Sequence, residues 1–177
     1  LVVCAPRYRQ FVENQIYAQY PQAQIKSIKD YTTFSPKSKQ VFTSTELALK
    51  TDYYLPIKTF VSFEVDPLAS ITGAISKLSP GYEAWVQVVV RPIDNSWQKK
   101  GKSIVNSRKN KVDSEGVKVG LESGESEELG EIEKKNTKVG FQFIIRLAAK
   151  GPDQLVTEHL LEDVVASFKQ FQTAHLN

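Results

Sequence analysis

The stretch LPIKTFVSFEVDPLASITGAISKLSPGYEAWVQVVVRP, at residues 55–92, carries the clearest pattern of secondary structure in the chain. Apolar or β-branched side chains recur at every second position from Ile57 to Val65, which predicts a strand over residues 55–65. Asp66 then suits the N-cap of a helix, and Pro67 suits its first turn. This half of the stretch therefore predicts a strand that leads directly into a helix.

The second half of the stretch predicts the rest of the helix and another strand. Apolar side chains recur at helical spacing from Leu68 to Leu78, and Pro80 and Gly81 then favour a turn. Residues 85–90 are apolar almost throughout, which is typical of a strand buried on both faces. We therefore expect residues 85–90 to form a central strand.

Working outward toward the N-terminus, the sequence predicts a β-α-β unit. Residues 1–5 form a short apolar run that suits a strand, and Pro6 suits the start of a helix. Apolar side chains then recur at spacings of three and four until Pro21, which ends the helix. Residues 22–32 follow as an extended, mostly polar segment, and we expect a strand at or near a sheet edge.

Toward the C-terminus, further strands and helices complete the prediction. Residues 41–49 and 138–149 favour strands, residues 96–110 favour a short helix, and Gly151-Pro152-Asp153 opens a last helix with a broad apolar stripe. The predicted fold class is α+β, with a mixed, largely antiparallel sheet of ferredoxin-like character and helices mainly on one face.

Length and composition favour one globular domain over residues 1–177. A chain of 177 residues with 41% hydrophobic residues can bury a core without metals or disulfides. The chain has no methionine and opens inside an apolar run, so we expect a fragment of a longer protein. The formal net charge of +3 is too small to indicate a partner by itself.

The single cysteine and the absence of long apolar runs bear on the compartment. Cys4 is the only cysteine, so no intrachain disulfide is expected, which suits a reducing compartment. No apolar run approaches the roughly 18 residues of a spanning helix. We expect a cytoplasmic domain without direct membrane insertion, held at the inner face of the membrane only through a segment outside this chain.

Charge is segregated in the middle of the chain. The segment 97–111 joins an indole to a run of cations, and it is the best candidate for contact with a nucleic acid or a partner. Its candidate residues are Trp97, Lys99, Lys100, Lys102, Arg108, Lys109 and Lys111. An acidic, glycine-interrupted segment follows, which predicts a flexible charged insertion at 111–136 that ends in a helical turn and can neutralise the cations by folding back.

No catalytic or metal-binding motif in the sequence has all the residues that its chemistry requires. Gly101-Lys102-Ser103 resembles the end of a phosphate-binding loop, but Ser96 stands where the loop needs its first glycine. His159 and Asp163 have the i, i+4 spacing of a ligand pair, yet only His175 remains as a further histidine, so a solvated helix face explains them better. We expect no enzyme activity, no cofactor and no metal.

Three segments resemble a known family. FVENQIYAQYPQAQI at residues 11–25, the stretch 55–92 with Trp97 shortly after, and VGFQFIIRLAAKGP at residues 139–152 are similar to an uncharacterised bacterial domain. That domain lies N-terminal to the ATPase in type IV secretion or conjugation-type DNA-transfer proteins of small-genome bacteria of candidate phyla. The resemblance implies no catalytic residues, and it implies an accessory domain that docks the motor to its channel, to itself or to cargo.

We therefore expect a non-enzymatic interaction or assembly domain of a type IV secretion or conjugation-type ATPase protein, with protein partners or self-association. The alternative is a domain that contacts nucleic acid through residues 97–111. A third, more remote alternative is an enzyme that acts on a small molecule, which would need a closed pocket with convergent polar groups.

Overall fold

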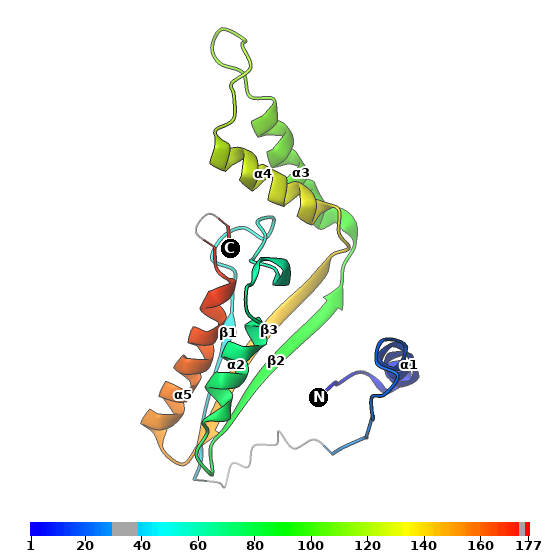
Figure 1. The fold of residues 1–177 in the computed structure, drawn as a ribbon, viewed down its shortest axis with the longest axis vertical. Helices are drawn as coiled ribbons and strands as arrows, with labels where there is room; N and C mark the ends of the chain where they lie inside the picture. The colour runs from blue at the N-terminus through cyan, green and yellow to red at the C-terminus, as the bar shows by residue number, and fades with distance from the viewer. Residues whose placement is uncertain (30–38, 174–175) are drawn as a thin grey trace. The chain divides into compact units, whose positions relative to one another are not determined.

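A computed structural model describes residues 1–29, 39–173 and 176–177, and the chain divides into two compact units, Leu1–Ser38 and Lys39–Asn177 (Figure 1). The first unit contains the 3-10 helix η1 (Pro6–Tyr8) and helix α1 (Arg9–Gln19), neither of which has a buried residue. The helix was predicted correctly. The expectation of one domain over the whole chain stays a prediction.

The strands predicted around α1 are not present in the described part of this unit. Residues 1–5 and 22–29 have no strand, and the remainder of the strand expected at 22–32 lies outside the described residues. A strand requires a partner that pairs its backbone N–H and C=O groups. Neither segment finds one, so the β-α-β prediction is wrong for the residues that can be described.

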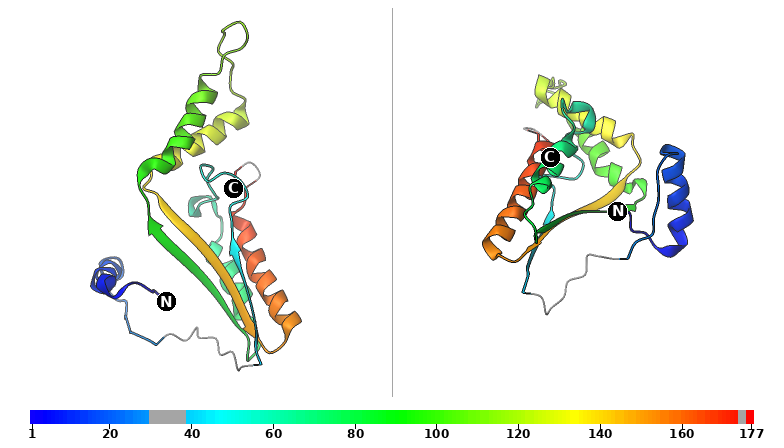
Figure 2. Two further views of the ribbon diagram at one scale, coloured as in Figure 1. Left: turned by 180° about the vertical axis from the view of Figure 1, so that it is seen from behind. Right: turned by 60° about the horizontal axis from the view of Figure 1, so that its bottom comes forward.

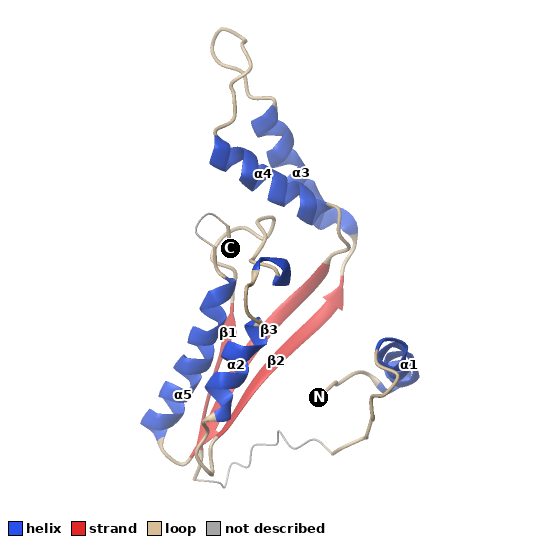
Figure 3. Cartoon of the chain, in the orientation of Figure 1, coloured by secondary structure: helices blue, strands red, loops and turns tan. Residues whose placement is uncertain are grey.

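The second unit contains an antiparallel three-stranded sheet, which confirms the α+β class. Strands β1 (Val41–Leu47), β2 (Glu83–Pro92) and β3 (Phe141–Gly151) have the order β1-β3-β2 (Figure 3). The strand at residues 85–90 therefore exists, but it lies at an edge of the sheet, and the prediction of a central strand is wrong. The central strand is β3, which pairs with both neighbours; the ferredoxin-like character stays a prediction.

Helices α2 (Pro67–Ser76) and α5 (Gln154–Ser167) cover one face of the sheet (Figures 1 and 2). Both begin where the sequence predicted, because a carboxylate caps each helix. Asp66 accepts a hydrogen bond from the backbone N–H of Leu68, and Asp153 accepts one from that of Val156, both at 2.9 Å. The core beneath them is built on Leu147, Ala149, Leu161 and Val164.

The strand predicted at residues 55–65 is not formed, and this prediction is wrong. The segment is irregular apart from the 3-10 helix η2 (Phe60–Ser62). Its backbone groups pair with the C-terminal part of the chain, since the N–H of Lys58 donates to the carbonyl of Phe171 at 3.0 Å. Pro56 has no N–H to give to a strand ladder.

A helical hairpin lies beyond one end of the ribbon that β2 and β3 form (Figure 1). It comprises the 3-10 helix η3 (Asn95–Trp97), α3 (Gln98–Lys109) and α4 (Ser123–Asn136). A second core fills its interior, with Val105, Leu129 and Ile132 packed against Leu55. The segment at 111–136 thus contains a 14-residue helix where the sequence indicated only a helical turn, because Leu129 and Ile132 face α3 at i, i+3 spacing.

Candidate functional site

The basic segment 97–111 coincides with α3, the first long helix of the hairpin. Trp97 ends η3, Lys111 follows α3, and the other candidate residues, Lys99, Lys100, Lys102, Arg108 and Lys109, lie on α3 itself. At 100° per residue, these five side chains are distributed around the helix and do not form one stripe. Helix α3 therefore does not present them as a single basic face.

Half of these cations are paired with carboxylates, several of them from the acidic segment. The ion pairs are Lys100–Asp52 at 2.6 Å, Arg108–Glu125 at 3.4 Å, Arg108–Glu128 at 3.8 Å and Lys109–Glu133 at 2.7 Å. The hydrogen bond from Lys100 lowers the pKa of Asp52. Within the described chain, Lys99, Lys102 and Lys111 have no carboxylate within ion-pair distance.

Trp97 packs against the backbone at the start of β3. Its indole lies so close to Gly140 that a methyl group there would overlap Nε1 and approach Cδ1 at 2.6 Å. The side chain is half-buried, and its Nε1 has no hydrogen-bond partner among the residues described. Trp97 therefore joins the hairpin to the ribbon, and the part of its indole beside Gly140 is covered by the backbone.

The remaining sequence candidates do not form a reaction centre. Gly101-Lys102-Ser103 lies inside α3, so its backbone N–H groups serve the helix and do not form a phosphate cradle. Cys4 is exposed, and His175 lies outside the described residues. No group of three or more His, Cys, Asp or Glu side chains is arranged to hold a metal ion in the part of the chain that can be described.

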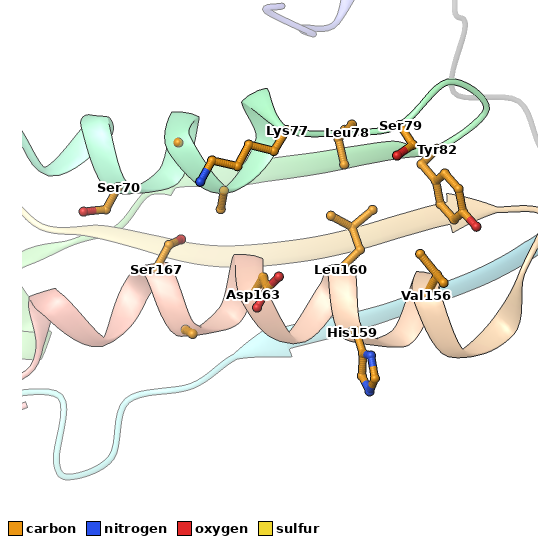
Figure 4. A pocket seen from close by; sticks show the side chains of 13 residues that line it. Ser70, Lys77, Leu78, Ser79, Tyr82, Val156, His159, Leu160, Asp163 and Ser167 are labelled. Atoms are coloured by element: carbon orange, nitrogen blue, oxygen red, sulfur yellow. The ribbon is translucent and has the colours of Figure 1, made fainter.

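His159 and Asp163 lie beside an open depression of about 540 Å³ between α2 and α5 (Figure 4). The imidazole of His159 points away from α2, while Leu160 faces α2 across the depression (Figure 4). The pair thus occupies a helix surface, and among the described residues it belongs to no group of three potential metal ligands.

A second and larger concave surface is an apolar groove of about 1420 Å³ on the helix-covered side of the sheet, which we call the ribbon groove. Its floor includes Val139, Phe141 and Phe143 at the hairpin end of β3, and Phe168 and Phe171 line it after α5. Phe141 is 57% exposed and Phe143 is 44% exposed. Val88 and Val90 continue the same apolar face on β2 and are also exposed.

The lining of the ribbon groove is strongly biased toward positive charge. Its cations are Lys50, Arg91, Lys135, Lys138 and Lys169, whereas Asp94 is its one carboxylate. Asp94 is already engaged as the cap of η3, where it accepts a hydrogen bond from the backbone N–H of Ser96 at 2.7 Å. Hydrogen bonds from the hydroxyl and the backbone N–H of Ser96 lower the pKa of Asp94. No cation of the lining has an ion-pair partner among the described residues.

Lys135 is the most enclosed of these cations. Its ammonium donates hydrogen bonds to the backbone carbonyls of Tyr53, at 2.5 Å, and Leu55, at 3.0 Å. Burial lowers its pKa, and no carboxylate of the described residues lies within ion-pair distance to compensate for the loss of water. A half-buried ammonium is therefore held at the wall of the groove by dipoles alone.

Asn177 fixes the loop that forms this wall. Its side-chain oxygen accepts from the backbone N–H and the hydroxyl of Thr51 at 2.7 and 2.6 Å. Its amide nitrogen donates to the carbonyls of Asp52 at 2.8 Å and Leu55 at 3.0 Å. Asn177 is 4% exposed, so these bonds are shielded from water.

The sequence did not reveal the ribbon groove, because the pattern over residues 138–149 predicts only a strand with Val139, Phe141 and Phe143 on one face. They do lie on the covered side of the sheet, but the helices are too short to reach them. Strand β3 has 11 residues and spans about 36 Å, whereas α5 has 14 residues and spans about 21 Å. The lengths of the predicted strand and helix could have indicated the groove, since a strand that is longer than its covering helices leaves part of its apolar face exposed.

No helix in the described residues is both long and apolar enough to cross a bilayer. No curated protein matches the chain, and no solved structure matches it. A family model described as a domain of unknown function (DUF8128) matches residues 2–177, so the chain belongs to that family.

Proposed function

We propose that the chain is a non-enzymatic interaction and assembly domain, and that it engages protein partners or further copies of itself through the ribbon groove. The observation that carries this proposal is the exposed apolar floor of the groove. Large contiguous apolar surfaces are uncommon on monomeric proteins and mark sites of interaction. The volume of about 1420 Å³ also exceeds the roughly 300–1,000 Å³ typical of small-molecule sites.

The cellular setting that we propose is a type IV secretion or conjugation-type ATPase protein. The resemblance of residues 11–25, 55–92 and 139–152 to the domain that precedes such an ATPase supports this setting. In that setting, the domain docks the motor to its channel, to itself or to cargo. The chemistry of nucleotide hydrolysis then belongs to a separate part of the assembly.

The test compares a groove variant with a surface control. Phe141→Asp places a charge on the groove floor, whereas Val61→Asp changes a side chain that is 78% exposed and outside the groove. We measure self-association by sedimentation equilibrium, and binding to purified secretion or conjugation components by interferometry. Burial of a phenylalanine contributes about 1.5–3 kcal/mol, so Phe141→Asp should weaken association by roughly tenfold or more.

The control variant should associate like the wild-type chain, and circular dichroism checks that both variants fold. A monomeric wild-type chain that binds none of the components would refute the proposal. Equal weakening by Phe141→Asp and Val61→Asp would also refute the assignment of the interaction to the groove.

Nucleic-acid contact is a second candidate, supported by the three cations of segment 97–111 that lack a carboxylate partner. Neutralising Lys99, Lys102 and Lys111 together as glutamines should abolish binding and flatten its salt dependence, since each phosphate contact contributes a slope of about −0.9 in log K against log salt. Fluorescence anisotropy with single-stranded DNA, duplex DNA and RNA provides the measurement. Absence of binding to all three at low salt removes this candidate.

A further inference from the structure

We propose that the ribbon groove binds an acidic amphipathic segment of a partner protein, whose apolar side chains cover the phenylalanine floor while its carboxylates meet the surrounding cations. This inference rests on the proposed function and specifies the partner's chemistry. Two properties of the groove carry it, its apolar composition and its unbalanced charge, together with the poor match of the chain's own acidic helices.

The apolar part of the groove requires apolar side chains from the partner. Phe141 and Phe143 extend the floor along β3, and Phe168 and Phe171 lie 6.0 Å apart, centroid to centroid, where the chain leaves α5. Phe171 also packs edge-on against Phe63 at 5.2 Å. Four phenylalanine rings therefore line one groove, and aromatic side chains contribute much of the binding energy at protein interfaces.

The charged part of the groove requires carboxylates. Five cations line it against the single carboxylate of Asp94, which is already used as a helix cap. Complementary potentials across an interface favour encounter and select among partners. A neutral apolar segment would leave these cations uncompensated, and a basic segment would be repelled.

Lys135 adds to the requirement for a carboxylate from the partner, because its ammonium is already partly desolvated. Covering the groove removes further water from it, and an unpaired charge that loses its water is strongly destabilised. The carbonyls of Tyr53 and Leu55 supply dipoles to the ammonium but no countercharge. A carboxylate from the partner would supply it.

The acidic helices of a second copy do not present the required chemistry. Helices α4 and α5 are acidic, but α4 buries Leu129 and Ile132 against α3, and α5 buries Leu161 and Val164 against the sheet. Residues 1–29 do expose aromatic side chains, yet that segment is basic. Its charged side chains are Arg7, Arg9, Lys26 and Lys29 against Glu13.

The test uses three synthetic fluorescein-labelled peptides with one length and one apolar pattern, which carry Glu, Gln or Lys at the polar positions. Each is titrated with the full chain, and anisotropy is recorded from about 50 to about 300 mM sodium chloride. The Glu peptide should bind at least about tenfold more tightly than the Gln peptide, and its affinity should fall as salt rises. The Lys peptide should not bind.

Variants locate the effect in the groove. Neutralising Lys138 and Lys169 together as glutamines should remove most of the preference for the Glu peptide. The matched control, Lys118→Gln, changes an exposed lysine outside the groove and should have no effect. Phe141→Asp should abolish binding of every peptide.

The outcomes separate this inference from the proposed function. Equal or tighter binding of the Gln or Lys peptide, lost in Phe141→Asp, would overturn the acidic partner and leave a groove that binds polypeptides. Failure of the Glu peptide to bind would also overturn it, while sedimentation and component binding decide the proposed function independently. Self-association that Phe141→Asp abolishes would identify a second copy as the occupant in place of an acidic partner.

Discussion

Gly140→Ala should destabilise the protein, because the indole of Trp97 occupies the space that the new methyl group needs. The three atoms nearest to an added Cβ are Nε1, Cδ1 and Cε2 of this one ring, so the rigid indole would have to move as a whole. Gly140 does not have a positive φ, so the effect is steric and not a backbone strain.

The expected loss is about 1–3 kcal/mol, the usual cost of adding a methyl group to a packed site. Gly73→Ala is the matched control, since among the described residues no atom outside the local backbone of α2 and the two chain neighbours lies within 4 Å of a Cβ added there. Alanine favours a helix over glycine by about 0.8–1 kcal/mol, so Gly73→Ala should stabilise the protein. The same chemical change is therefore expected to act with opposite sign at the two positions.

Guanidinium denaturation followed by circular dichroism measures both changes. The chain has two tryptophans, so Trp85→Phe leaves Trp97 as the fluorescent reporter of its own displacement. Gly140→Ala should lower the midpoint and shift the emission of Trp97. A midpoint at or above that of the parent chain, or an unchanged Trp97 spectrum, would show that the indole does not pack against Gly140 as described.

Three further changes test other parts of the fold. Leu129→Ala should cost about 2–5 kcal/mol in denaturant, because Leu129 is fully buried, whereas Leu155→Ala at a 61% exposed position should change stability by less than about 0.5 kcal/mol. Asp153→Ala removes the cap of α5 and should cost about 1 kcal/mol in thermal unfolding, so an unchanged melting temperature would contradict the cap. The pKa of Asp52 beside Lys100 is lowered, so its carboxylate stabilises the fold at pH values above the ordinary pKa of an aspartate. This contribution disappears as the pH falls through the lowered pKa. Asp52→Asn should therefore lose less stability below about pH 4 than the parent chain does.

The parts of the fold that the sequence predicted correctly depend on local chemistry. Asp66 and Asp153 cap helices through hydrogen bonds that reach only two or three residues along the chain. The strand at residues 55–65 was predicted from alternation, which indicates an extended chain but not its partner. Its partner is decided by distant residues such as Phe171, whose carbonyl receives the N–H of Lys58.

In the candidate site, too, the sequence predicts which residues are charged, whereas distant contacts decide how they are paired. The cations of segment 97–111 could be found in the sequence, and so could the acidic segment that neutralises some of them. The pairing of Arg108 and Lys109 depends on how α4 packs on α3, and that is set by the buried contacts of Leu129 and Ile132. The ribbon groove could not be found from alternation, because Phe141 and Phe143 continue the pattern of the core beyond the reach of α5.

Two separate hydrophobic cores stabilise two different parts of the second unit. The cluster between α3 and α4 shares no buried residue with the cluster beneath α2 and α5. The helical hairpin can therefore open while the sheet stays folded. Its amide protons should exchange with solvent at a lower free energy of opening than those of β3. The ribbon groove is lined by Ile145 and Val165 of the sheet core and by Trp97 and Lys135 of the hairpin, so an occupant would couple the two openings and slow exchange in parts of α3 and α4 that it never touches.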